Sequence, residues 1–323
     1  TYTFGTAKGV SAGDSRVATG NLLQKVTYPD SAGGSDVVTF AYNTLNQQVW
    51  TQDQAGNVTE TDYDTGGRTT QRRVSTLAGG FDGTIRRIAM AYTTRGQVDT
   101  VSQYDNATVG SGTIKDQVQY AYDDWGNVST FTQDVDSGIG VSGRASFAVG
   151  YTYTKKTPSG GHDYIARTGM SLPGSGDSNT ITYGFNSVSP SLDELTGRVS
   201  TIKTGAAGGT TRVTYNYLGV AQIVGTDLAE PTSYSRLYGT GTANYSAIDR
   251  FGRVTQSRWT KDLVTPRNFY EVNLSYDRAS NITVATNTVH PGYDASYSMD
   301  GRNRLTRAEE GTWSGSAITT RTR

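Results

Sequence analysis

The chain has 323 residues, 29 basic and 29 acidic side chains, no cysteine and only two histidines. Zero net charge removes the usual electrostatic reason to expect nucleic acid as a partner. The absent cysteines exclude disulfides and thiolate metal sites, and two histidines are too few for most zinc sites, so we expect no metal and no other cofactor.

The remaining composition is typical of an all-β protein. The chain contains 39 Gly, 21 Tyr and 49 Thr, and 18% of its residues are charged. Thr and Tyr favour strands, whereas Gly favours tight turns. No apolar stripe repeats every 3.6 residues, and no apolar run approaches the ~20 residues that span a bilayer. The sequence therefore predicts many short strands, almost no helix and no membrane span in this segment.

A short pattern recurs along the chain. It consists of Tyr, an acidic residue or Asn, two variable residues, Gly, a polar residue and a β-branched residue. The clearest copies are residues 63–69 and 122–128, and residues 92–98 and 276–282 match with small departures. Looser copies centre on Asn46, Gly56, Gly197, Gly219, Gly252 and Gly301. Because internal repeats of this kind indicate one repeated supersecondary unit, we interpret the chain as a repeat array.

Aligned on the Gly position, six of the ten copies have an acidic residue three positions earlier and seven have a Tyr four positions earlier. The residues assigned in this way to the repeat turns are Tyr42, Asn46, Asp53, Gly56, Tyr63, Asp64, Gly67, Tyr92, Gly96, Tyr122, Asp123, Gly126, Glu194, Gly197, Tyr215, Gly219, Asp249, Gly252, Tyr276, Asp277, Tyr297 and Gly301.

The spacing predicts β-hairpins whose three-residue loop is a type I turn closed by a left-handed residue and a bulge. Gly suits that position because a Cβ there costs roughly 1–2 kcal/mol. The acidic residue is expected to accept backbone N–H groups of the turn. The register then places acidic residues opposite arginines, in the pairs Asp64–Arg68, Glu194–Arg198 and Asp249–Arg253. It also places Tyr63 opposite Thr69 and Tyr122 opposite Val128.

Residues 135–180 are the least regular part of the array. Strands are expected at 147–153, 164–168 and 180–185, with Gly- and Ser-rich loops at 137–143 and 173–178. We see no composition change that marks a domain boundary, so residues 1–323 are predicted to form one continuous array. The chain begins with Thr1 and lacks a terminating element, which suggests a segment of a longer polypeptide.

The repeat resembles the YD repeat of Rhs-type proteins. The resemblance rests on residues 53–59 leading into 63–69, and on residues 26–30 and 38–43, which are similar to the intervening half-repeat. Relatives of this family include bacterial Rhs and wall-associated proteins, toxin-complex cocoons and teneurins. The resemblance implies a strip of β-hairpins that spirals into a hollow shell, which in several members encloses a C-terminal toxin. The Asp-Pro core motif linked to self-cleavage in the family is absent here.

The expected function is therefore structural, without enzymatic activity. The chain would be a scaffold or encapsulating wall of a secreted or surface polymorphic toxin, and its partners would be the rest of its own polypeptide or neighbouring subunits. The alternative is an extracellular filament-forming or surface adhesion protein. In that case aligned Tyr residues and the four Trp residues could bind cell-surface glycans.

Other interpretations have simpler explanations. Carboxylate pairs such as Asp123 and Asp124 invite a glycosidase hypothesis, but adjacent residues on a strand point to opposite faces. Residues 134–138 resemble part of a calcium loop but lack the closing Glu. His162 and His290 fit exposed loops. Other closely spaced carboxylates are Asp134 with Asp136, Asp193 with Glu194 and Glu309 with Glu310.

The remaining alternative concerns the fold. Residues 191–197 resemble one repeat of a quinoprotein-type β-propeller, and a propeller enzyme is the remote alternative. That motif occurs once in the chain and the other turns do not follow it. The Gly-Ser-Gly at 174–176 is half a dinucleotide fingerprint with no βαβ pattern around it.

Overall fold

The computed structural model describes residues 1–29, 36–174, 179–186, 192–205, 208–229, 234–238, 247–261 and 267–321, and shows an all-β fold. The predicted fold class is thus confirmed. Parts of several motifs noted in the sequence, namely Asp30, residues 175–178 and Ser191, lie outside the described residues. No helix in the described ranges is long and apolar enough to cross a membrane.

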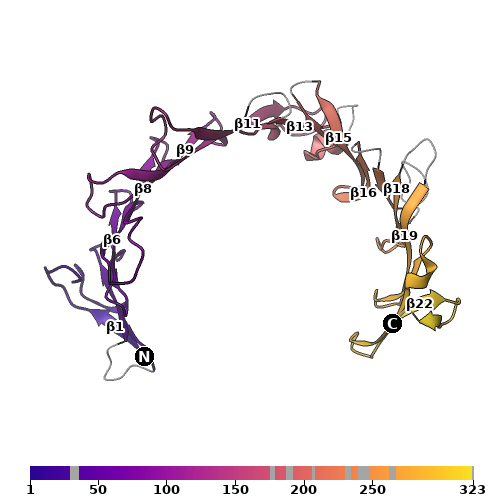
Figure 1. The fold of residues 1–323 in the computed structure, drawn as a ribbon, viewed down its shortest axis with the longest axis horizontal. Coiled ribbons are helices and arrows are strands. Elements are labelled where there is room, and N and C mark those ends of the chain that lie inside the picture. The colour runs from indigo at the N-terminus through magenta and orange to yellow at the C-terminus, as the bar shows by residue number, and fades with distance from the viewer. Residues whose placement is uncertain are drawn as a thin grey trace. The chain divides into compact units, whose positions relative to one another are not determined.

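The strands follow one another along the chain (Figure 1). They are β1 (Tyr2–Thr6), β2 (Thr19–Thr27), β3 (Val37–Tyr42), β4 (Gln48–Gln52), β5 (Val58–Tyr63), β6 (Thr69–Thr76), β7 (Arg87–Tyr92), β8 (Val98–Tyr104), β9 (Ile114–Tyr122), β10 (Val128–Val135), β11 (Ser146–Lys156), β12 (Tyr164–Ser171), β13 (Thr180–Gly184), β14 (Thr201–Thr204), β15 (Thr210–Leu218), β16 (Gln222–Leu228), β17 (Tyr234–Leu237), β18 (Gln256–Lys261), β19 (Arg267–Tyr276), β20 (Ile282–Asn287), β21 (Asp294–Met299), β22 (Leu305–Trp313) and β23 (Ile318–Arg321). Short helices also occur within the described ranges, among them α1 (Leu192–Thr196) and the 3-10 turn η3 (Pro291–Tyr293).

The chain divides into two units, Thr1–Gly150 and Tyr151–Arg323. In the first unit each strand pairs antiparallel with the next one in sequence, from β1 through the start of β11. In the second unit the same rule holds from β12 to β23. Within neither unit does the pairing break into four-stranded blades, which argues against the propeller alternative. A single continuous array over both units remains a prediction.

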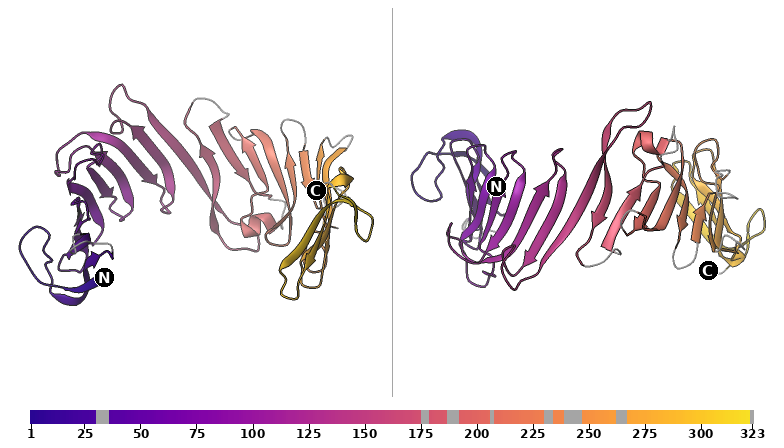
Figure 2. Two further views of the ribbon diagram at one scale, coloured as in Figure 1. Left: turned by 60° about the horizontal axis from the view of Figure 1, so that its bottom comes forward. Right: turned by 90° about the horizontal axis from the view of Figure 1, so that it is seen from above.

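The sheet of the first unit is a single layer (Figure 2), and its two faces carry different side chains. One face carries a row of polar side chains in which Ser102 lies opposite Gln117 and Gln117 lies opposite Asp134. On the other face Met90 lies opposite Val101, and Val101 lies opposite Val118. These apolar side chains are only half-buried. Antiparallel sheets normally pack such a face against a core, so this face lacks the usual cover among the described residues.

The buried core is correspondingly small. The buried apolar residues are Ala41, Tyr42, Val58, Ala166, Val224, Ala247 and Ile318. The chain exposes 18985 Å², whereas two compact monomers of half its mass together expose about 16,000 Å². By the same scaling it buries about 60% of its unfolded surface, as a 60-residue domain does, rather than the roughly 70% of a 150-residue domain. Stability therefore depends on contacts between neighbouring hairpins more than on a central core.

Candidate functional site

The repeated feature of the molecule is a row of turns at one end of the strands. In each unit the connections that follow odd-numbered strands lie at this end, and we call them the turn margin. The turn margin includes the turns at residues 43–47, 64–68, 93–97 and 123–127 in the first unit and 249–253, 277–281 and 300–304 in the second.

The turn at 64–68 shows the shared geometry. The Asp64 N–H donates to the Arg68 carbonyl at 2.9 Å, and the Gly67 N–H donates to the Asp64 carbonyl at 3.0 Å. Gly67 has φ +80°, the left-handed conformation in which a Cβ is disfavoured. The left-handed position of the other turns is occupied by Asn46, Gly96, Gly126, Gly252, Ser280 and Asn303. Each loop is thus the three-residue type I turn with a bulge that the spacing predicts.

The acidic residue organises the turn from within. Oδ1 of Asp64 accepts the N–H groups of Gly66 and Arg68, both at 2.9 Å, and Oδ2 pairs with the Arg68 guanidinium at 2.6 Å. The Arg68 backbone N–H and guanidinium hold the pKa of the Asp64 carboxyl below its usual range. Where Asn follows the turn, its amide replaces the arginine, so the Asn281 side chain lowers the pKa of Asp277.

Each turn is followed by a bulge that places the Tyr. Tyr63 lies opposite Thr69 and Asp62 lies opposite Gln71, so Thr70 is the extra residue. The Thr70 hydroxyl lies 3.2 Å from the Asp62 carbonyl and donates to it. Tyr122 likewise lies opposite Val128. The bulge thus repeats with the turn and sets the direction of the Tyr side chain.

The last turn differs from the sequence-based register by two residues. We aligned Gly301 with the left-handed position and Tyr297 with the repeat Tyr. Instead Asp300 carries the turn, with its N–H donating to Arg304, and Asn303 is left-handed at φ +60°. Tyr297 lies opposite Ala308 inside the strand pair. The prediction for Gly301 and Tyr297 is therefore wrong.

The copy at Glu194 and Gly197 is not a hairpin. Residues 192–196 form the one-turn helix α1, and Gly197 ends it at φ +69°. Arg198 pairs with Asp193 rather than Glu194, because the helix brings Asp193 to that side. The predicted Glu194–Arg198 pair is therefore wrong, whereas Asp249 pairs with Arg253 at 2.7 Å as expected.

The copy at Tyr215 and Gly219 is also shifted. Leu218 lies opposite Gln222, and Gly219 is left-handed at the first loop position rather than the last. Tyr217, two residues after Tyr215, makes the contact that repeat tyrosines make elsewhere. The assignment of Tyr215 is therefore wrong.

The turn at Asp53 and Gly56 has the repeat geometry, with Gly56 at φ +86°. It joins β4 to β5 and so lies at the opposite end of the strands from the turn margin. There Asn57 accepts the N–H of Ala78 from the next connection at 2.7 Å. The sequence alone does not separate this turn from those of the turn margin.

Consecutive turns of the turn margin are joined by tyrosine hydroxyl groups. Tyr122 donates at 2.7 Å to the carbonyl of Val98, the second residue after the left-handed Gly96 of the preceding turn. The same contact joins Tyr63 to Gln48, Tyr92 to Thr69, Tyr217 to Val199 and Tyr276 to Val254. Burial raises the pKa of the Tyr122 hydroxyl, which keeps it a proton donor.

A second contact runs in the opposite direction. The residue after the left-handed position reaches the next turn, as Gln97 does when its amide donates to the Gly126 carbonyl at 2.9 Å. Gln47 donates to Gly67, Arg198 to Gly219, Arg253 to Asp277 and Asn281 to Asn303. Arg68, Arg198 and Arg253 also lie over the next tyrosine ring, 4.3–4.7 Å from its centroid. We call each pair of opposed contacts a reciprocal clamp.

Sequence reasoning placed the tyrosines and arginines but not these contacts. It assigned Arg to pairing within its own hairpin, which Arg68 and Arg253 also do. The clamp partners are 15–24 residues apart in sequence for the tyrosine hydroxyls of Tyr63 through Tyr276. The signal in the sequence that could have indicated these contacts is the Tyr that recurs four residues before the Gly position. A cross-strand pair within one hairpin explains that recurrence equally well.

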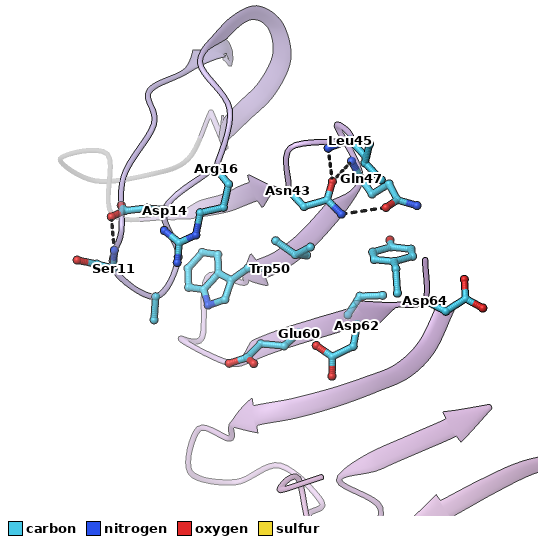
Figure 3. A pocket seen from close by; sticks show the side chains of 15 residues that line it. Ser11, Asp14, Arg16, Asn43, Leu45, Gln47, Trp50, Glu60, Asp62 and Asp64 are labelled. Carbon is cyan, nitrogen blue, oxygen red and sulfur yellow. Dashed lines mark hydrogen bonds between the residues drawn. The ribbon is translucent and has the colours of Figure 1, made fainter. Parts of the chain in front are cut away.

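A hollow in the first unit gathers aromatic and acidic side chains. Figure 3 shows the Trp50 indole between the Arg16 side chain and the carboxylates of Glu60 and Asp62. The connection after β1 covers it, with Gly13 packed so closely on the indole that a Cβ would lie 3.2 Å from it. Its carboxylates are engaged, since both Glu60 and Asp62 pair with Arg73 of β6, at 2.8 and 3.3 Å.

The other candidate sites stay dispersed. Asp134 is fully buried and accepts hydrogen bonds from the Ser137 and Ser146 hydroxyls, so it joins both ends of the connection after β10. His162 and His290 are exposed. Across the described ranges, no group of three or more His, Asp or Glu side chains could hold a metal ion.

Comparison with known proteins identifies a similar fold. No protein-family model matches the chain, and no curated protein matches it. The crystal structure of TcdB2-TccC3-TEV matches with a TM-score of 0.54 and 10% identity, over 90% of this chain and 13% of that one. That of TcdB2-TccC3 without its hypervariable C-terminal region covers 88% and 19% at 10% identity, with a TM-score of 0.18. The fold is thus similar to a segment of a much longer chain.

Proposed function

We propose that this chain is a structural wall segment of a larger β-shell of the Rhs/YD-repeat type. The observation that carries the proposal is the turn margin, in which one turn geometry recurs and reciprocal clamps join consecutive hairpins. Such contacts extend a sheet by adding like units, as in other repeat architectures. A wall needs this property, whereas a catalytic site needs groups that converge on one point.

The exposed surface supports a role inside a larger assembly. The chain exposes roughly 3,000 Å² more than two compact monomers of half its mass. A standard protein interface buries ≈ 1,600 Å² in total, so several contacts of that size could be accommodated. The partners we propose are the remainder of the same polypeptide or neighbouring subunits. The similar fold of a segment within TcdB2-TccC3-TEV agrees with a part that belongs to a longer chain.

The described carboxylates favour a structural role over hydrolysis. Asp64 and Asp249 form ion pairs within their turns, and Glu60 and Asp62 pair with Arg73. A glycosidase needs two carboxyl groups on either side of one bond. The role we propose is therefore a non-enzymatic scaffold or enclosing wall, secreted or at the cell surface, as the YD-repeat resemblance implies.

Electron microscopy of the intact natural polypeptide tests the proposal. Negative-stain images should show closed hollow particles, with this segment located in the wall by an antibody fragment raised against it. Images of filaments would overturn the shell proposal and favour the alternative of an extracellular filament-forming protein. Solid globular particles would overturn both.

A further inference from the structure

We propose that the reciprocal clamps make the turn margin a nearest-neighbour cooperative device, in which each turn is ordered by the turns before and after it. Loss of one clamp would then loosen an adjacent hairpin rather than the hairpin that carries the substitution. This property follows from side-chain contacts between hairpins and holds whether or not the chain belongs to a shell.

The backward half of the clamp acts on the preceding turn. The Tyr92 hydroxyl donates at 2.7 Å to the Thr69 carbonyl, two residues after Gly67. Thr69 immediately precedes the bulge residue Thr70, where the strand pairing is disrupted. The hydroxyl therefore stabilises the preceding hairpin at the place where its own backbone pairing is weakest.

The forward half acts on the following turn. The Gln97 amide donates at 2.9 Å to the carbonyl of Gly126, the left-handed residue of the next turn. A Cβ on Gly126 would lie 3.3 Å from that amide nitrogen, so the two turns are in close contact. The Gly126 N–H already donates to the Asp123 carbonyl within its own turn, and the hydrogen bond from Gln97 restricts this backbone further from the neighbouring hairpin.

These two contacts join the turn at 93–97 to the turn before it through Tyr92 and to the turn after it through Gln97. This matches repeat proteins whose stability is a sum of unit terms and nearest-neighbour terms. The small core supports the same conclusion, because only a few apolar side chains in the described part of the chain are buried. A net hydrogen bond of about 1 kcal/mol corresponds to roughly a fivefold change in local opening.

Amide hydrogen exchange of single variants distinguishes an effect on the neighbouring turn from an effect on the substituted turn. In Tyr92→Phe, the Gly67 and Arg68 amides should exchange roughly three- to tenfold faster. The amide of Gly96, in the variant's own turn, should change less than about twofold. In Gln97→Leu, the Gly126 and Asn127 amides should exchange faster by a similar factor.

Tyr120→Phe is the matched control, since Tyr120 contacts the Phe131 ring edge-on through its own ring. It should leave exchange at all these amides unchanged, and circular dichroism should show that every variant folds. Faster exchange confined to the substituted turn would overturn the proposal. So would a uniform increase over the whole first unit, or no increase at all.

Discussion

The Tyr122 hydroxyl donates a 2.7 Å hydrogen bond to the backbone carbonyl of Val98, 24 residues earlier on the neighbouring hairpin. The aromatic ring of Tyr122 reaches the preceding hairpin at the turn margin, where Gln97 reaches forward to Gly126. Each tyrosine of this type thus has two roles, one opposite a β-branched residue of its own hairpin and one on the hairpin before it.

Tyr122→Phe should destabilise the first unit by about 0.5–1.5 kcal/mol, because it removes one hydrogen bond and keeps the ring. The midpoint of urea unfolding measures the change. Tyr120 lies two residues earlier in β9, on the same face of the sheet. Tyr120→Phe should therefore shift the midpoint little. Equal losses in the two variants would contradict a specific role for the Tyr122 hydroxyl.

Asn303→Val should cost about 1–2 kcal/mol, because Asn303 has φ +60° and a β-branched residue is disfavoured there. Gly301→Ala should be neutral or slightly stabilising, since a Cβ at Gly301 meets nothing within 4 Å. Thermal unfolding of both variants measures the difference. A larger loss in Gly301→Ala would favour the sequence-based register over the observed one.

Stability should fall below about pH 4, where the turn carboxylates take up protons. The pKa values of Asp64, Asp277 and Asp300 are lowered in the folded chain by hydrogen bonds from Arg68, Asn281 and Arg304. The unfolded chain then binds more protons in this range, so stability is present above the unfolded pKa and is lost as the pH falls through the folded pKa.

Urea unfolding between pH 2 and 6 checks this expectation. In Asp277→Asn the slope of stability against pH should be smaller, because one of the titrating groups is gone. A stability that stays constant down to pH 2 would show that these carboxylates have the same pKa in both states.

Arg87→Met should destabilise the connection after β8 by about 1–3 kcal/mol. Arg87 is 4% exposed, donates to the carbonyls of Asn106 and Ser111, and stacks on the Tyr104 ring at 3.8 Å. Its removal takes away both of these hydrogen bonds and the stacking on Tyr104. Hydrogen exchange of residues 105–113 should increase, whereas Arg72→Met, at an exposed position of β6, should leave that segment unchanged.

The two register errors at the turn margin have one physical cause. At the last turn the repeat is shifted from Gly301 to Asn303, and in the second unit the clamp tyrosine is shifted from Tyr215 to Tyr217. Both shifts are of two residues. Because side chains alternate with a period of two, such a shift leaves every residue on the same face, so the hydrophobic pattern cannot detect it.

The error at Glu194 has a different cause. Gly197 is left-handed as predicted, but a left-handed glycine ends a helix as readily as it closes a hairpin. The residues that decide between the two lie upstream of the pattern, where Asp193 takes the arginine partner assigned to Glu194.

The sequence by itself determined the high Tyr, Thr and Gly content, the all-β class and the turn chemistry. Those features are local, since Asp64, Gly67 and Arg68 complete a turn within five residues. Only the tertiary structure decided which turns lie beside each other and that Tyr122 bonds to Val98. These contacts depend on which connections follow odd-numbered strands and on the length of each connection. They therefore join residues whose separation in sequence follows no fixed period.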